Sequence, residues 1–346
     1  MEKGATMRKA LLRVSIVLLV GLGAYFYYQK PSTGVYPLAK VVINLTPDAA
    51  SSLIWAAEGA GYFREQNLQP EFKVFGAGKL ALEDLVANPN TDYTFVYETP
   101  IAKQIINGKE LRLLTGLHTS NRNTRLVMKG SKPASEPDGL IGKRIGVQMG
   151  TNAEFALIEL LNRNGIQMSE VKAINMLGTQ IPKRVTTNEV DGVMIWNPFF
   201  GEAVRNLKAE GNAYWEPELG YYHEYSFLVT DQARAQKNAQ LSVRVLAAIN
   251  KAYELYKSEP DKFAEYAGAF TPVSMGKEKV KAELTNVDLI FGLNSKMAQA
   301  LQMEVKYFCI TQGDCNTDAL QRRDSAIDTT ALDRVAPHLN QYRSVR

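Results

Sequence analysis

Short apolar runs alternate with longer amphipathic stretches along most of the chain. The first runs have the length and composition of buried β-strands: 40–45, 71–75, 92–97, 111–117 and 125–129. Between them, apolar residues recur at helical spacing, as in 49–61, for which Asp48 is the predicted N-cap. Strands that alternate with helices at this interval predict βαβ units and a parallel sheet.

The alternation resumes in the second half of the chain. Predicted strands are 144–148, 172–175, 192–195 and 225–229, with a short helix at 180–187. The last of these strands would return the chain to the first group of strands. From 239–257 to about Leu301 the pattern predicts helices only.

The stretch from Asp138 to Gly165 carries the clearest chemistry. A strand leads into the turn Met149-Gly150, and Thr151 to Glu154 match a capping box at the start of a helix. At such a turn the helix dipole and free N–H groups favour a negatively charged ligand group. Many strand–helix turns of this kind bind nothing, so the turn alone leaves both interpretations open.

Composition narrows the class of protein. The chain has 346 residues, of which 45% are hydrophobic, and a net charge of +4 from 40 basic and 36 acidic residues. This length supports two packed domains. The small, dispersed charge excess and the lack of zinc-finger, P-loop or RNA-binding motifs argue against a nucleic-acid partner.

The N-terminus differs from the rest. Basic residues precede the uncharged run Val14 to Tyr28, which is either a cleaved signal peptide or a retained anchor. The aromatic residues at 25–28 favour an uncleaved transmembrane helix within 1–30. Residues 31–39 then form a tether, and the chain beyond it is exported to the periplasm.

The cysteines are few. Cys309 and Cys315 are the two cysteines of the chain and are separated by a polar turn. In an exported protein this spacing predicts a small disulfide loop. In a cytosolic protein the two residues would be ordinary thiols.

Several motifs together resemble a known family. Gly61-Tyr62-Phe63 followed by Asn67-Leu68, the segment DGLIGKRIGVQMG at 138–150, and NEVDGVMIWNP at 188–198 occur in the family's order. They resemble the periplasmic substrate-binding proteins of ABC importers for nitrate, sulfonate and taurine, which include thiamine-precursor binders. The similarity covers about residues 40–230. Asn67 and Gly192 depart from the family pattern.

The resemblance implies an α/β fold of two lobes, the type II-like periplasmic binding protein, each lobe a sheet flanked by helices. Lobe I would comprise 40–125 and 230–346, and lobe II 126–229, with hinges near Arg125–Lys129 and Tyr225–Val229. It implies a monomer that traps a small-molecule solute between the lobes and delivers it to an ABC importer permease. The protein would then be a tethered binding protein without cofactor or metal, not an enzyme.

In this fold the strand-end turns of both lobes meet at one cleft. They nominate these ligand-binding residues: Thr46, Asp48, Gly76, Gly78, Glu98, Thr99, Thr119, Gly150, Thr151, Asn152, Trp196 and Asn197. Individually each Thr, Asp or Asn also fits a simple helix cap.

Three side chains indicate which kind of ligand the protein could bind. Glu98 near Asp48 would suit an amine or a ring N–H rather than a plain anion, although it also fits a solvated loop acid. Trp196 fits either core packing or stacking against a heterocycle. His118 at a strand end could bind ligand or make a structural bond.

The sequence thus predicts a binding protein for a taurine-like sulfonate or a thiamine-precursor-like ring. Two alternatives from other classes remain: a tethered sensor that acts through a partner protein, and an enzyme similar to the synthase of the thiamine pyrimidine. The cysteine-rich motif of that synthase is absent from the sequence.

Overall fold

The computed structural model describes residues 36–135, 139–217, 219–270, 272–312 and 317–342. The chain divides into the units Met1–Pro37 and Leu38–Arg346, and every element named below belongs to the second unit. In the described residues, no helix has the length and apolar character needed to cross a membrane. The membrane helix predicted within 1–30 lies outside those residues, as does most of the predicted tether.

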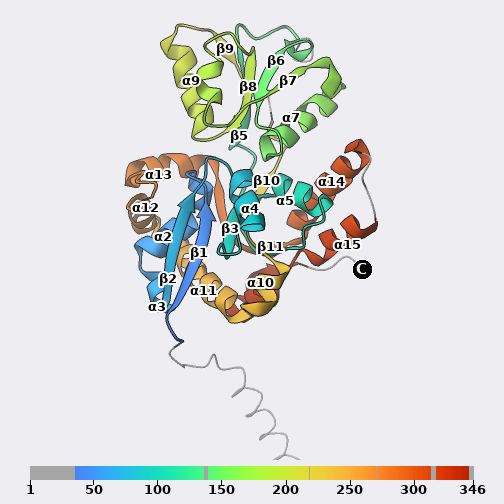
Figure 1. Ribbon diagram of the computed structural model, residues 1–346. Helices are drawn as coiled ribbons and strands as arrows, with labels where there is room; N and C mark the ends of the chain where they lie inside the picture. The colour runs from blue at the N-terminus through green and yellow to red at the C-terminus, as the bar shows by residue number, and fades with distance from the viewer. Residues whose placement is uncertain (1–35, 136–138, 218, 271, 313–316, 343–346) are drawn as a thin grey trace, which may run out of the picture. The chain divides into compact units, whose positions relative to one another are not determined.

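Two β-sheets organise the unit Leu38–Arg346 (Figure 1). The larger has the strand order β12-β11-β4-β10-β3-β1-β2. Its strands are β1 (Ala39–Leu45), β2 (Leu68–Val74), β3 (Tyr93–Tyr97), β4 (Leu111–Ser120), β10 (Glu224–Asp231), β11 (Asp288–Asn294) and β12 (Asn340–Gln341). The smaller has the order β7-β6-β8-β5-β9. Its strands are β5 (Thr124–Lys129), β6 (Arg144–Val147), β7 (Lys172–Asn175), β8 (Gly192–Trp196) and β9 (Tyr214–Trp215).

The sheets are mixed, whereas the alternating pattern predicted parallel ones. In the larger sheet β1 pairs in parallel with β2 and β3, but β10 lies antiparallel between β3 and β4. β11 also runs antiparallel to β4. The prediction that only helices follow residue 239 is therefore wrong at Asp288–Asn294. This strand is stabilised by pairing with β4, which is far away in the sequence, and local periodicity does not reveal such a partner.

The helices follow the predicted order with shifted ends. They are α2 (Ser52–Gly59), α3 (Tyr62–Glu65), α4 (Gly78–Ala87), α5 (Glu98–Ile106), α7 (Asn152–Arg163), α8 (Ile181–Arg184), α9 (Phe199–Ala209), α10 (Gln232–Lys237), α11 (Ala239–Ser258), α12 (Pro260–Gly268), α13 (Lys277–Glu283), α14 (Ser295–Gln312), α15 (Thr317–Ser325) and α16 (Thr330–Val335). Short 3₁₀ turns are Ala49–Ser51, Met168–Glu170, Leu284–Asn286 and Pro337–Leu339.

Each sheet has its own hydrophobic core. Trp55 and Phe270 stack in the core of the larger sheet, with ring centroids 6.0 Å apart. Phe155 and Trp196 lie in the core of the smaller sheet, which Phe308 of α14 also joins. Every residue of β3 and of β8 is buried, because helices cover both faces of these central strands. Separate cores allow each sheet with its helices to act as a lobe.

The chain crosses between the sheets twice. It first leaves β4 at Ser120 and enters β5 at Thr124, and it returns between Trp215 of β9 and Glu224 of β10. The sequence assigned 126–229 to lobe II, but β10 pairs with β3 and β4 of the larger sheet. The predicted hinge stretches 125–129 and 225–229 are themselves strands, so the connections beside them are the candidate hinges.

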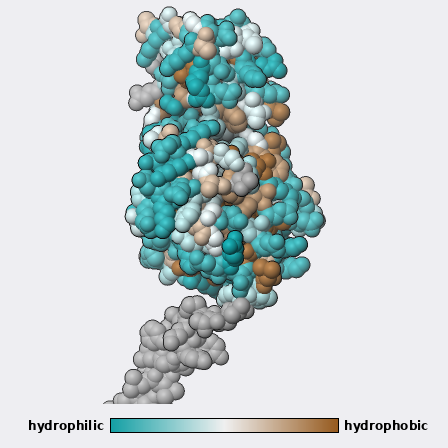
Figure 2. Space-filling model, turned by 90° about the vertical axis from the view of Figure 1, so that its left-hand side faces the viewer, coloured by the Kyte–Doolittle hydropathy of each residue, from teal (hydrophilic) through white to brown (hydrophobic). Residues whose placement is uncertain are grey.

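The face shown in Figure 2 is mostly hydrophilic, with hydrophobic residues gathered part-way along its right-hand side. Over the described residues, the exposed large hydrophobic side chains are Leu38, Val74, Ile141, Leu177, Met303 and Ile310. Met303 and Ile310 both lie on α14, and the other four lie on separate segments of the chain. Scattered exposed hydrophobic residues are normal for a folded protein surface.

Two helical glycines provide a matched test of packing. A Cβ on Gly268 at the end of α12 would lie 2.5 Å from backbone atoms of Gly276 and Lys277. A Cβ on Gly201 in α9 would lie 3.3 Å from Nη1 of the flexible Arg205 side chain. Gly268→Ala should lower the free energy of unfolding by about 1–3 kcal/mol. Gly201→Ala should leave it unchanged or raise it by up to about 1 kcal/mol. Urea unfolding of both variants checks this, and equal effects would contradict the close backbone approach.

Candidate functional site

A small cavity lies where strand ends of the two sheets meet. It has a volume of only about 10 Å³ and is lined by Asp48, Gly78, Lys79, Tyr97, Pro100, Thr151, Asn152 and Trp196. Asp48, Gly78, Lys79, Tyr97 and Pro100 come from the larger lobe, and the other three from the smaller one. We call this cavity the cleft. It brings together five of the residues that the sequence nominated: Asp48, Gly78, Thr151, Asn152 and Trp196.

Asp48 supplies a carboxylate to the cleft. Its Oδ1 accepts a hydrogen bond from the Ala50 N–H at 3.1 Å, so the predicted cap is confirmed. Its Oδ2 is buried and makes no hydrogen bond within the described residues. Burial raises the pKa of Asp48 to about 6, although the Thr46 hydroxyl and the Ala50 amide lower it in part. At neutral pH the carboxylate is therefore charged, with one oxygen available to a donor.

Two helix N-termini and a lysine face the same cleft. No side chain caps the first amides of α4, which begins at Gly78, or of α7, which begins at Asn152. The Lys79 ammonium donates to the Met149 carbonyl across the lobes at 3.1 Å. Uncapped N–H groups and a cation favour a negatively charged ligand group. The cleft thus offers sites of opposite charge to one small molecule.

The start of α7 differs from the capping-box prediction. The Thr151 hydroxyl donates to the Gln148 carbonyl at 2.7 Å instead of accepting from an amide of the helix. Glu154 reaches back one residue further, to the Gly150 N–H at 2.5 Å, and pairs with Lys103 at 2.7 Å. Gly150 adopts a left-handed φ of 81°, which turns its amide toward Glu154. Thr151 and Glu154 occupy the predicted positions at the start of the helix, but their side chains bond to other groups than the capping box requires.

Two other nominated residues, Thr99 and Asn197, are not the N-caps of the helices beside them. α5 begins at Glu98, so Thr99 and Pro100 lie inside its first turn. α9 begins at Phe199, with Pro198 rather than Asn197 as its N-cap. Helix ends are the least certain part of any sequence-based prediction because several polar residues near a turn fit the same position.

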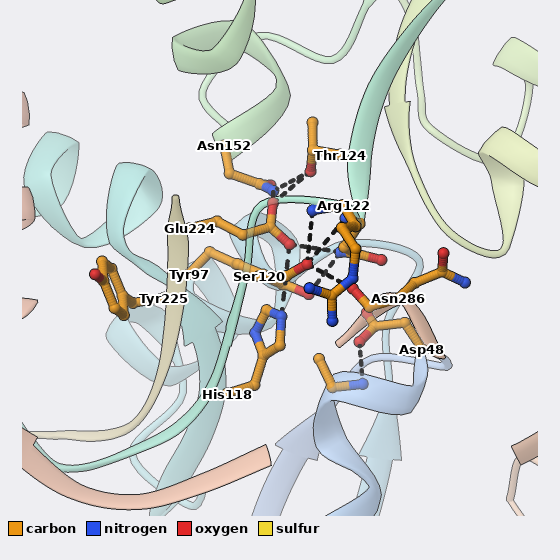
Figure 3. A network of polar contacts seen from close by, with 12 residues as sticks. Asp48, Tyr97, His118, Ser120, Arg122, Thr124, Asn152, Glu224, Tyr225 and Asn286 are labelled. Carbon is orange, nitrogen blue, oxygen red and sulfur yellow. Dashed lines mark hydrogen bonds and ion pairs between the residues drawn. The ribbon is translucent and has the colours of Figure 1, made fainter. Parts of the chain in front are cut away.

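Behind the cleft, Glu224 joins the two sheets through buried hydrogen bonds (Figure 3). One carboxylate oxygen accepts from Asn123 Nδ2 at 2.6 Å. The other accepts from Thr124 Oγ1 at 2.5 Å and from Asn152 Nδ2 at 2.7 Å. Burial raises the pKa of Glu224 to about 7, and these three donors oppose the increase. The sequence did not nominate Glu224, because it lies at the beginning of a strand that runs antiparallel to its neighbours.

His118 faces Glu224 from β4. Its Nε2 lies 3.6 Å from Glu224 Oε1, and its ring packs edge-on against Tyr97 with centroids 5.5 Å apart. Burial lowers the pKa of His118 to about 3, and Arg122 adds to the effect. The same burial raises the carboxyl pKa of Glu224, so the neutral form of both groups is favoured. The expectation of a role for His118 stays a prediction.

Glu98 is fully buried near Glu224 and its hydrogen-bond partners, and it does not line the cleft. Its carboxylate accepts from the Tyr225 N–H at 2.9 Å, and the Tyr222 hydroxyl lies 3.3 Å from it. That hydroxyl lies equally close to the Asn152 carbonyl of the smaller lobe. Burial raises the pKa of Glu98 to about 8, with a further contribution from the charge of Glu224. Its predicted contact with a ligand amine is untested.

The remaining nominated residues lie at the same strand ends but do not line the cleft. Thr46 and Thr99 are fully buried and Asn197 is 6% exposed. A Cβ on Gly76 would lie 3.1 Å from Thr179 of the opposite lobe, and Thr119 pairs with Tyr225 and Asp288 within the larger sheet. Alternation along β4 directs His118 and Ser120 to one face and Thr119 to the other. The nominated Thr119 therefore lies one position away, on the opposite face of β4 from His118 and Glu224.

The predicted disulfide stays a prediction. Cys309 is buried in α14, and Cys315 lies outside the described residues.

Two sheets with helices, a double crossing and a cleft at the strand ends define a two-lobed binding-protein fold. Solved structures share it. The alkanesulfonate-binding protein SsuA of Xanthomonas axonopodis, bound to MOPS, matches with a TM-score of 0.68 at 17% identity, over 85% of this chain and 99% of that one. The nitrate-binding protein NrtA of Synechocystis matches with a TM-score of 0.66 at 11% identity, over 87% and 89%.

The sequence comparisons agree. The family profile described as "NMT1/THI5 like" matches residues 49–263. The taurine-binding periplasmic protein of Escherichia coli is 31% identical over 93 residues, which are 27% of each chain. This chain belongs to the NMT1/THI5-like family, so the family resemblance noted in the sequence is confirmed.

The buried acids predict how stability depends on pH. Glu98 and Glu224 have folded-state pKa values of about 8 and about 7, above those of an unfolded chain. Between roughly pH 4.5 and 8 the folded state therefore holds more protons, and the free energy of unfolding falls as pH rises. The fall should be on the order of a few kcal/mol.

Urea unfolding from pH 5 to pH 8 measures this dependence. Glu224→Gln, which mimics the protonated acid, should flatten the curve by removing one of the titrating groups. A matched change at an exposed acid, Glu278→Gln, should leave the slope intact. Stability that rises over this interval would contradict the burial argument.

Proposed function

We propose that this protein is the solute-binding component of an ABC importer and that it traps a small zwitterion in the cleft. The observation that carries the proposal is the pairing of opposite charges at one small cavity: the unbonded Oδ2 of Asp48 and the uncapped N-termini of α4 and α7 beside Lys79. The fold shared with sulfonate- and nitrate-binding proteins supports a binding role rather than catalysis.

The ligand we propose has an ammonium group that donates to Asp48 and a sulfonate-like group that accepts from the helix N-termini and Lys79. The cleft is narrow in this structure, which favours a compact molecule of the taurine type over a larger heterocycle once the lobes open to admit it. Tyr97 and Trp196 supply apolar walls for its carbon atoms. The relative named for taurine binding fits the same chemistry.

Closure of the lobes would retain the ligand. The connections between Ser120 and Thr124 and between Trp215 and Glu224 would act as hinges. Contacts across the lobes, such as that of Asn152 with Glu224 and that of Lys103 with Glu154, would re-form at each closure. The protein would work outside the cytoplasm as a monomer, held at the membrane by its N-terminal segment and delivering ligand to the permease.

Asp48→Asn tests the ammonium site. The substitution keeps the shape but removes the charge, so taurine affinity should fall by about 1.5–3 kcal/mol, or roughly tenfold or more. Ethanesulfonate, which lacks the ammonium group, should lose far less. Isothermal titration calorimetry at pH 7.5 measures both. An equal effect on the two ligands, or no binding of any sulfonate, nitrate, pyrimidine or amino acid, would refute the proposal.

Tryptophan emission tests the location of the ligand. Trp196 lines the cleft, whereas Trp215 lies elsewhere in the smaller lobe, and both are nearly buried. Ligand-induced change in emission should persist in Trp215→Phe and be lost in Trp196→Phe. The reverse result would place the ligand away from the cleft.

A further inference from the structure

A second, larger cavity is lined in part by Tyr222. It is bounded by α7, α14 and the chain segment that leads into β10, and encloses about 1080 Å³, part of it open to solvent. Its lining includes Phe155, Tyr221, Tyr222, Tyr225 and Glu304, none of which lines the cleft. We call it the rear cavity.

One wall of the rear cavity carries a buried acid with one unsatisfied oxygen. Glu304 of α14 is 1% exposed, and its Oε2 makes no hydrogen bond within the described residues. A buried carboxyl without a partner is unfavourable for the protein alone. Such a group facing a cavity is therefore a candidate ligand contact.

Aromatic rings form much of the remaining wall. Tyr221, Tyr222, Tyr225 and Phe155 all face the rear cavity. The guanidinium of Arg163 already lies 3.9 Å from the centroid of the Tyr221 ring. Ring faces attract cations, and an organic ammonium has both the charge and the apolar groups to match such walls.

We propose that the rear cavity binds a small organic ammonium ion, with Glu304 as its counter-ion and the tyrosine rings as its walls. This inference does not depend on the ligand of the cleft. It gives the protein a second site for a ligand of cationic character.

The charges around Glu304 determine how binding responds to pH. The charged groups that act on it are Glu98 of α5 and Glu154 and Glu159 of α7. Arg163, Lys296 and His223 line the same cavity. Burial raises the pKa of Glu304 and the charges of Glu98, Glu154 and Glu159 raise it further, whereas the nearby Thr99 hydroxyl lowers it in part. A bound cation stabilises the carboxylate, so binding should release a proton and tighten as pH rises.

Calorimetry with choline and its neutral isostere 3,3-dimethylbutan-1-ol tests the proposal on the full chain. Choline should bind saturably, and its measured enthalpy should vary with the ionisation enthalpy of the buffer because a proton is released. The alcohol should bind roughly tenfold more weakly or worse, since it has the same shape without the charge. Equal binding of both, or no binding of choline at millimolar concentration, would overturn the proposal.

Three variants locate the site. Glu304→Gln should reduce choline affinity at least tenfold and remove the buffer dependence. Glu159→Gln makes the same charge change at another acid of the cavity wall and should have a much smaller effect. Asp48→Asn separates the two cavities: if it abolishes choline binding while Glu304→Gln does not, the ion occupies the cleft and the proposal is wrong.

A second pair of variants guards against failure of Glu304→Gln to fold. Tyr221→Phe keeps the ring and should retain choline binding, whereas Tyr221→Leu removes the ring and should weaken it. Thermal unfolding confirms that each variant is folded. Equal affinity in the two tyrosine variants would rule out the aromatic wall.

Discussion

The arrangement of the two lobes depends on one buried carboxylate. Glu224 begins the strand that returns the chain to the larger sheet, and it accepts hydrogen bonds from Asn123, Thr124 and Asn152. Those donors belong to the outgoing crossing, to the first strand of the smaller sheet and to the helix that follows its second strand. Removing one partner of such a group leaves a buried polar atom unsatisfied, at a cost of about 1–3 kcal/mol. The network therefore fixes both crossings and the start of α7 relative to each other, and with them the walls of the cleft.

The same constraint shapes the electrostatics of the site. Asp48, Glu98, Glu224 and Glu304 are all buried, and burial raises the pKa of each of them. His118, the base nearest to Glu224, is held neutral by its own burial. A proton on Glu98, Glu224 or Glu304 therefore takes the place of a counter-ion, whereas Asp48, with a pKa of about 6, is charged at neutral pH. A cationic ligand group that enters either cavity competes with a proton, which makes binding sensitive to pH around neutrality.

Local sequence patterns predicted most of the helices and strands, but few of the strand pairings and side-chain contacts. The strand at 192–195 and the helix after Asn238 were predictable because buried residues form an apolar run in the strand and recur at helical spacing in the helix. β11 was missed because its place beside β4 comes from pairing over a long sequence separation. For the site, Asp48 and Asn152 were found because strand-end turns converge in this fold. Glu224 was missed because it begins an antiparallel strand, where no turn motif marks it.

Tyr222 lines the rear cavity and also contacts Asn152, a residue of the cleft. Its ring lines the rear cavity, while its hydroxyl lies 3.3 Å from Glu98 in one lobe and from the Asn152 carbonyl in the other. The position of this hydroxyl depends on the lobes being together, since one of its neighbours belongs to each lobe. Under the proposed closure of the lobes, a ligand that orders the Tyr222 ring would favour the closed arrangement. By thermodynamic reciprocity, a ligand in the cleft would then favour occupancy of the rear cavity by the same factor.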